Sequence, residues 1–253
     1  MRWMMRFALI LIALPALAEP PAGYYDSAQG QTGQALKTAL HDITKGHTVY
    51  SYDEVWALLQ YTDEDPKRRT HVILIYSGRS HPKADIYQRG SGQDQWTREH
   101  VWPKSHGFPD EADTPFTDLH HRRPADKSVN TSRSNRDFAD GGEPHEEVVG
   151  AFRGNGTFEA PGRVKGDLAR ALFYMAVRYE GEGGNPDLEL STGITMSGTP
   201  HIGDLCTLLS WHDSDPVDAW ERDRNDRVFK VQGNRNPFID RPEFVNEIWG
   251  GEC

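Results

Sequence analysis

The stretch that decides the fold is TREHVWPKSHG at residues 97–107, followed by DLHHRRPADKSVNTSRSN at residues 118–135. Both segments combine carboxylate, imidazole, amide and cationic side chains, and both hold few apolar residues. They predict three short elements: a strand over Thr97–Val101, a strand over Asp118–Pro124 and a helix over Val129–Phe138. Residues that bind metals and move protons are therefore expected on two neighbouring strands and the helix that follows them.

Phosphodiester hydrolysis needs three kinds of group, and these segments contain all of them. A base must deprotonate water, a cation must neutralise the charge that develops on the phosphate and the leaving oxygen, and cationic side chains must hold the phosphates. His100 has an intrinsic pKa near neutrality, which suits a general base. Glu99 is a hard oxygen ligand suited to Mg²⁺, and Asn130 supplies a neutral oxygen of the same hardness. Two protein ligands leave open positions for water and phosphate.

Taken singly, these residues have ordinary structural explanations. On a strand, Glu99 and His100 leave opposite faces, and such a pair more often lies on a surface. A lone Asn130 is typical of a turn or a helix cap, and a cluster of arginines is typical of a solvated face. The combination, in this order and spacing, favours a catalytic site.

The same residues belong to longer motifs: R-E-H-V-W-P at 98–103, D-L-H-H at 118–121, P-A-D at 124–126, V-N-x-x-R-S-N at 129–135 and Q-G-N-R-N-P-F-I-D-R-P-E-F at 232–244. Together they resemble the bacterial secreted endonuclease I family, whose members are periplasmic and extracellular nucleases of the ββα-metal (His-Me finger) type. The resemblance extends over most of the chain, from about residue 30 to residue 250.

The resemblance implies a β-hairpin followed by a helix, embedded among α-helices. His100 matches the family's general base, and Glu99 and Asn130 match its two metal ligands, with Asn130 at the head of the motif helix. One divalent cation is implied as the cofactor, Mg²⁺ with Mn²⁺ or Ca²⁺ as alternatives. In-line attack by water, departure of the 3′ oxygen and 5′-phosphate products follow, with DNA and RNA as the implied partners.

Contacts to nucleic acid are expected from a basic strip within residues 119–136. We assign phosphate binding to Arg122, Arg123, Lys127, Arg133 and Asn135. For Arg133 and Asn135, capping of the helix is an equal alternative. Some members of the family place a phosphate-stabilising arginine in the linker that corresponds to residues 108–117. This chain has none there, so Arg122, Arg123 or Arg133 is expected to substitute.

The rest of the chain predicts mainly helices. They are expected over Gln34–Thr44, Tyr52–Gln60 and Asp167–Tyr179, from Asp215-Pro216 to a stop at Gly233, and over a last stretch with Phe244, Val245, Ile248 and Trp249 inward. Asp167, Asp215 and Asp240 are the expected N-caps. A buried strand is predicted over His71–Tyr76, and a long loop over residues 139–165. The predicted fold class is α+β: one mostly helical domain around a central β-hairpin and helix.

Residues 1–18 have the composition of a secretory signal peptide. Arg2 and Arg6 precede an apolar run over Phe7–Leu17 that is too short to span a bilayer, and Ala16-Leu17-Ala18 is a small-x-small cleavage site. A short buried N-terminal helix is the alternative. We expect cleavage after Ala18, a single nuclease domain over residues 19–253, a secreted or periplasmic location and no membrane segment after cleavage.

An exported chain meets an oxidising compartment, where cysteines pair. The sequence has two cysteines, Cys206 and Cys253, so we expect a disulfide between them. Two unpaired thiols are the alternative. Closing a loop of this size contributes roughly 4 kcal/mol at most in the chain-entropy account.

The formal net charge of −10 is unusual for a protein dedicated to binding nucleic acid. An acidic body with one basic strip suits an enzyme that must release a polyanion. We therefore predict a secreted, metal-dependent, largely sequence-nonspecific endonuclease, with a monomer favoured. The alternatives are a metal-dependent phosphodiesterase or phosphatase acting on small phosphate esters, and a non-catalytic exported module that binds nucleic acid.

Overall fold

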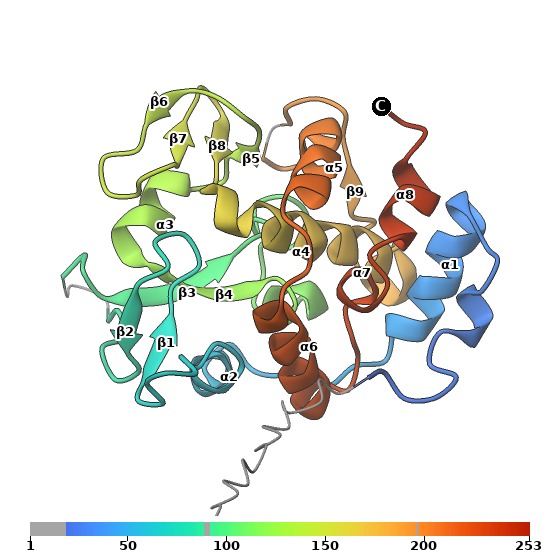
Figure 1. Cartoon of the computed structure of the whole chain (residues 1–253), viewed down its shortest axis with the longest axis horizontal. Helices are drawn as coiled ribbons and strands as arrows, with labels where there is room; N and C mark the ends of the chain where they lie inside the picture. The colour runs from blue at the N-terminus through green and yellow to red at the C-terminus, as the bar shows by residue number, and fades with distance from the viewer. Residues whose placement is uncertain (1–18, 89–91, 196) are drawn as a thin grey trace, which may run out of the picture.

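The first quoted segment forms a strand that pairs with a strand from the second quoted segment. In the computed structural model, which describes residues 19–88, 92–195 and 197–253, strand β3 (Trp96–His100) runs antiparallel to β4 (Arg122–Asp126). Helix α3 (Lys127–Arg133) follows β4 directly. Figure 1 shows this β3–β4 pair with α3 at its edge. The predicted signal peptide, residues 1–18, lies outside the described residues.

The second strand begins four residues later than the sequence predicts. Residues 118–121 form a turn, in which the backbone oxygen of Asp118 accepts hydrogen bonds from the amides of His121 and Arg122 at 3.4 and 3.2 Å. The ladder then pairs His100 with Arg122 and Glu99 with Arg123. All five residues of β4 are buried, so its arginines lie inside the molecule.

The motif helix is shorter than predicted. The prediction of a helix over Val129–Phe138 is wrong beyond Arg133, where Ser134 takes the left-handed backbone conformation at φ 55°. The amide of Ser134 still bonds the carbonyl of Asn130 at 2.8 Å and closes the last turn. Phe138 then lies in β5 (Asp137–Phe138) rather than in the helix.

Helices surround a central buried helix, α4 (Lys165–Arg178), which crosses the middle of the molecule in Figure 1. Every residue of α4 from Gly166 onward is buried, because α5 and α1 pack directly against it. In the described part of the chain the other helices are α1 (Gly33–Thr44), α2 (Glu54–Thr62), α5 (Leu205–Ser214), α6 (Ala219–Gln232), α7 (Pro237–Asp240) and α8 (Phe244–Trp249). The prediction that helices predominate over strands is therefore confirmed.

The three predicted N-caps are wrong, each for a local reason. Asp167 lies within the first turn of α4, whose N-cap is Val164. Asp215 is the C-cap of α5, a helix that was not predicted, and α6 begins after Asp218, whose carboxylate accepts from the amide of Glu221 at 2.9 Å. Asp240 ends α7, whereas Glu243 precedes α8.

The C-terminal end of α6 agrees with the prediction. Gly233 follows the helix with φ +91°, a left-handed conformation that glycine adopts without steric cost.

Strands are short and form small sheets. The predicted strand over His71–Tyr76 is confirmed for its first half, since β1 (His71–Ile73) pairs with β2 (Ser80–Pro82). The prediction of a long loop over 139–165 is wrong, because β6 (Glu143–Pro144), β7 (Phe152–Arg153) and β8 (Thr157–Glu159) join β5 in a four-stranded sheet. β9 (Glu189–Leu190) and β10 (His201–Ile202) form a parallel pair.

The fold is thus a mixture of helices with small sheets, held by one large hydrophobic cluster and a smaller one beneath β3. A disulfide joins Cys206 of α5 to Cys253, with the two Cα atoms 5.7 Å apart, as predicted. It fastens the end of the chain, which Figure 1 shows beyond α8, to the central helices. Over the described residues, no helix combines the length and apolarity needed to span a bilayer.

Candidate active site

The end of β3, the segment after it and α3 border one cavity of about 340 Å³. The lining residues are Arg98, Glu99, His100, Pro103, Lys104, Ser105, Asn130, Ser134 and Asn135. The sequence predicted His100 as the base and Glu99 and Asn130 as the two metal ligands. All three residues border this cavity. Their contacts determine what each can do there.

Glu99 is 2% exposed and is held from one side. The hydroxyl of Tyr76 donates to Oε1 at 2.7 Å, and Nη1 of Arg133 donates to the same oxygen at 3.3 Å. Burial raises the pKa of this carboxyl group, and the charge of Arg133 opposes that rise. Because both side-chain donors use Oε1, the carboxylate is oriented while Glu99 still borders the cavity.

His100 is oriented by a backbone carbonyl. Its Nε2 lies 3.0 Å from the carbonyl oxygen of Phe116, and because that oxygen can only accept, Nε2 carries the proton. The Nδ1 atom of the neutral ring therefore keeps its lone pair. Burial lowers the pKa of His100 well below 6.5, and the charge of Arg122 lowers it further. The imidazole is neutral at pH 7, the form that can accept a proton from water.

Aromatic rings pack around His100 and limit its movement. The ring of Phe116 meets it edge-on with centroids 4.6 Å apart, and Tyr52 stacks at 6.2 Å. The ring of His121 lies 5.6 Å away, and its own Nε2 donates to the carbonyl of Pro115 at 2.8 Å. A ring held in this way keeps one nitrogen turned to a backbone acceptor.

Asn130 lies in the last turn of α3, not at the head of the helix as expected, because the helix begins three residues earlier at Lys127; its side chain is partly exposed. Among the described residues, no group forms a hydrogen bond with its side-chain amide, whereas its backbone carbonyl accepts from Ser134. An amide oxygen that borders a cavity and has no protein partner is available to a ligand. The donor set at this cavity is therefore one carboxylate and one amide oxygen, which is the chemistry of a site for a hard divalent cation.

Three of the five predicted phosphate contacts point into the protein instead. Arg122 and Arg133 are 0% exposed and Arg123 is 5% exposed. Arg122 Nη2 donates to the carbonyl of Arg98 at 3.1 Å, and Arg133 Nη2 donates to the carbonyl of Val101 at 2.6 Å. These guanidinium groups hold the backbone of β3 and cannot reach a phosphate on the surface. The expectation of phosphate binding is corrected for these three residues.

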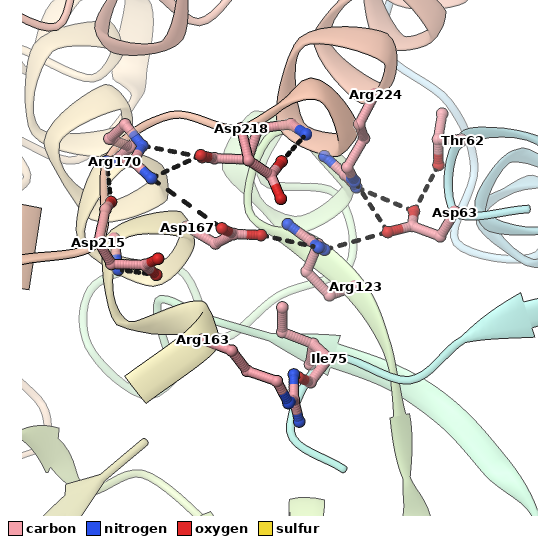
Figure 2. Close-up of polar contacts among 12 residues, drawn as sticks. Thr62, Asp63, Ile75, Arg123, Arg163, Asp167, Arg170, Asp215, Asp218 and Arg224 are labelled. Atoms are coloured by element: carbon pink, nitrogen blue, oxygen red, sulfur yellow. Dashed lines mark hydrogen bonds and ion pairs between the residues drawn. The ribbon is translucent and has the colours of Figure 1, made fainter. Parts of the chain in front are cut away.

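Arg123 is the centre of a buried ionic network (Figure 2). Its Nε lies 3.0 Å from Asp63, and its Nη2 donates to Asp167 at 3.5 Å. Arg224 of α6 also binds Asp63, at 2.8 Å. Figure 2 shows Arg123 between the two carboxylates, with Asp63 at the end of α2 and Asp167 on α4. The network connects β4 to three helices. Removing one partner of a buried ion pair strongly destabilises a protein, because the other charge stays buried without compensation.

The other two predicted contacts remain near the surface. Asn135 is exposed and borders the cavity. Lys127 is partly exposed at the start of α3, where its Nζ donates to Thr131 at 2.6 Å and lies 5.0 Å from the ring centroid of Tyr87. Lys127 does not border the cavity.

Tyr76 and Lys104 are among the groups at the site that were not predicted as site residues. Tyr76, in the predicted strand His71–Tyr76, orients Glu99, but its hydroxyl reaches the carboxylate from 23 positions away in the sequence. Lys104 lies inside the first quoted segment, four residues after His100, and borders the cavity. Spacing within the segment could have suggested Lys104, whereas nothing local pointed to Tyr76.

A second group of acids lies elsewhere in the described structure, where Glu180, Asp187 and Glu189 offer oxygens close enough for one cation. The ammonium group of Lys37 already pairs with Glu180 and Glu189 at 2.7 and 2.5 Å. The protein itself therefore supplies the positive charge at that cluster.

Comparison with known proteins agrees with the family resemblance of the sequence motifs whose residues border this cavity. A family model described as Endonuclease I matches residues 32–243. The chain belongs to the endonuclease I family. It is 48% identical over 243 residues to an extracellular ribonuclease of Bacillus subtilis (strain 168), covering 94% of this chain and 83% of that protein.

Two further relatives extend the comparison. An extracellular ribonuclease of Bacillus amyloliquefaciens is 48% identical over 227 residues, covering 89% of this chain and 78% of the relative. An extracellular deoxyribonuclease of Aeromonas hydrophila is 32% identical over 143 residues, covering 54% of this chain and 56% of the relative. The protein is accordingly an endonuclease with a secreted or periplasmic location.

Proposed function

We propose that this endonuclease hydrolyses phosphodiester bonds of DNA and RNA with one divalent cation, with little sequence preference, and with His100 as the general base. The observation that carries the proposal is the cavity itself. It is bordered by an oriented neutral imidazole, an oriented carboxylate and an amide without a protein partner. In this proposal β3, β4 and α3 form the ββα-metal motif.

The residues present fit a hard divalent cation. Glu99 and Asn130 would hold it through one carboxylate and one amide oxygen, and Mg²⁺ prefers such oxygen ligands with several positions left to water. When bound, the cation supplies charge neutralisation at the phosphate and at the departing oxygen. Tyr76 and Arg133 keep the Glu99 carboxylate in place without occupying both of its oxygens.

The chain's own proton chemistry centres on His100. Its Nδ1 takes a proton from a water molecule as the water oxygen bonds to phosphorus. The bond from phosphorus to the 3′ oxygen breaks, its electron pair stays on that oxygen, and the oxygen is protonated by water. The products are a 5′-phosphate and a 3′-hydroxyl, and His100 returns its proton to solvent. The Phe116 carbonyl holds Nε2–H throughout and so keeps Nδ1 directed to the water.

The substrate assignment rests on the relatives and on the kind of contact available. Relatives are named as ribonucleases and as deoxyribonucleases, so both polymers are proposed here. The residues exposed at the cavity are polar and cationic and suit the phosphate backbone, which carries no direct sequence information. We expect cleavage at many sites with weak sequence preference.

The test is digestion of a plasmid and of a structured RNA by the exported protein with Mg²⁺, with and without EDTA. His100→Ala should lower turnover by about 10²–10⁴-fold, the usual contribution of a general base, while circular dichroism stays unchanged. His201→Ala is the matched control, because His201 is exposed and does not border the cavity. Full activity of His100→Ala would refute the mechanism.

The same experiment separates the alternatives. Faster cleavage of a nucleotide-sized phosphodiester than of either polymer would identify a small-ester phosphodiesterase. Salt-sensitive retention of DNA without any nicking in Mg²⁺ would identify a binding module.

We also propose that the mature protein starts at residue 19 and consists of one nuclease domain. Mass spectrometry of the exported protein is expected to give the mass of residues 19–253 with the disulfide formed. A mass that retains residues 1–18 would contradict cleavage after Ala18.

A further inference from the structure

Burial of the three arginines leaves a question about charge at the cavity. A phosphodiester gains negative charge on its non-bridging oxygens as water attacks, and a nearby cation stabilises that charge. The protein has a net charge of −10, and the segment 108–117 that borders this region carries three acids and no basic residue. A cationic side chain of the cavity would add to the stabilisation that the proposed metal ion supplies.

Among the described residues that line the cavity, two side chains are cationic, and Arg98 is already engaged. Its guanidinium carbon lies 3.3 Å from the ring centroid of Tyr52 and 4.2 Å from that of Trp56. It also donates to the backbone carbonyl of Tyr52, and its side chain is 11% exposed. Arg98 is clamped between helix α2 and the strand, so it is not free to meet a substrate.

Lys104 has the opposite environment. It is exposed, and within the described structure no carboxylate lies within ion-pair distance of its ammonium group. Its Nζ lies 5.2 Å from the ring centroid of Phe116. The same ring packs against His100 at 4.6 Å, and the carbonyl of the same residue holds Nε2 of His100. Phe116 therefore places a free ammonium group and the proposed base at one cavity.

We propose that Lys104 is a catalytic residue whose ammonium group contacts a non-bridging oxygen of the scissile phosphate and stabilises the charge of the transition state. This inference rests on the proposed function. The ammonium group of a lysine is carried on a flexible four-carbon stem, so it can reach a substrate oxygen in more than one orientation. Because Lys104 is exposed, it need not break a buried ion pair to do so. The interaction strengthens as the phosphate gains charge, so it acts on turnover more than on binding.

The experiment compares Lys104→Gln, Lys104→Arg and Lys230→Gln in Mg²⁺-dependent cleavage, with kcat and KM measured separately and single-turnover rates at saturating enzyme. Lys230 is an exposed lysine on α6 outside the cavity, so its substitution removes the same charge elsewhere. Lys104→Gln should lower kcat and the single-turnover rate about 100-fold, the effect of removing one transition-state donor. KM should change by less than about 3-fold, because the contact strengthens in the transition state and adds little to binding of the ground state.

Lys104→Arg should recover at least about 10-fold of that loss, because it restores the charge, and Lys230→Gln should match the wild type. Urea unfolding of each variant checks that the fold is retained, and Lys104→Ala serves if the glutamine variant unfolds. An unchanged kcat in Lys104→Gln, or a rise in KM alone, would overturn the role of Lys104 while wild-type cleavage and its loss in His100→Ala leave the proposed function standing. Absence of metal-dependent cleavage by the wild type would overturn both.

Discussion

The residues at this site differ in which of their side-chain atoms form hydrogen bonds with the rest of the protein. Tyr76 and Arg133 both donate to Oε1 of Glu99, and the carbonyl of Phe116 accepts from Nε2 of His100, so the side-chain donors to Glu99 share one oxygen and His100 is held through one nitrogen. Asn130 has a side-chain amide with no protein partner in the described structure. Partners of this kind orient a ligand or base without blocking it.

Asn130→Asp is expected to change metal preference at the site. The substitution adds a negative charge at a proposed ligand oxygen, which should strengthen binding of divalent cations and alter the ratio of activities with Mg²⁺, Mn²⁺ and Ca²⁺. Cation titrations of cleavage, with isothermal calorimetry of the protein alone, would measure this. Asn246→Asp is the matched control, since Asn246 is exposed on α8 and does not border the cavity. Identical titrations for Asn130→Asp and the wild type would count against Asn130 as a ligand.

Elements differ in how far local sequence determines their limits. The strand β3 and the start of α3 lie within two residues of the predicted positions, because chain breakers such as Pro103 and Gly107 act locally. The end of α3 does not, since Ser134 turns into the left-handed region and Arg133 is drawn into the protein by the carbonyls of His100 and Val101. Several aspartates precede α6 in the sequence, and local sequence does not distinguish among them as N-caps. In the structure the cap is Asp218.

Asp218→Ala is expected to destabilise the protein by about 1 kcal/mol, because the side chain caps the N-terminus of α6 by accepting from the amide of Glu221. The measurement is urea unfolding at pH 7. Asp223→Ala is the control, since Asp223 lies on the same helix and makes a surface ion pair with Arg227 that is worth a few tenths of a kcal/mol. Equal effects of the two substitutions would show that Asp218 is not a significant cap.

For the whole molecule, charge is distributed differently from the way the sequence suggests. The basic strip of residues 119–136 is not a basic surface, because β4 is buried and its arginines meet Asp63, Asp167 and backbone carbonyls. Imidazoles are buried as well. Burial lowers the pKa of His120 to about 4, that of His121 to about 3 and that of His212 to about 4. All three are therefore neutral in the folded protein at pH 7.

Stability should fall as the pH drops from 6.5 to 4. Each of these histidines has a folded pKa below the ordinary 6.5, so in this window the unfolded chain binds more protons, and acid favours unfolding. A shift of the size given for His120 corresponds to roughly 3 kcal/mol at most. Urea unfolding at intervals between pH 7 and 4 would measure the slope.

His120→Gln tests the source of that slope. The substitution removes one titrating group, so the loss of stability between pH 6.5 and 4 should be smaller than in the wild type, even if the variant is less stable at pH 7. His201→Gln, at an exposed position, should keep the wild-type slope. An unchanged slope in His120→Gln would mean that other groups control the acid sensitivity.

The sequence by itself determined the residue types that meet at the proposed site and most of the elements that hold them. Glu99, His100 and Asn130 stand in motifs whose residue types suit one reaction, and helices with apolar faces and strands with alternating residues are specified by neighbours a few positions apart. The pairing of Cys206 with Cys253 also followed, since the chain has no other cysteine.

Only the tertiary structure decided which charged groups face solvent. Tyr76 and Arg133 reach Glu99 from 23 and 34 positions away, and Asp167 meets Arg123 from 44 positions away. An arginine has the same local signal whether it holds a phosphate or a buried carboxylate. The difference depends on partners brought by distant segments, because the desolvation of a charge is compensated only where folding places an opposite charge or a carbonyl beside it.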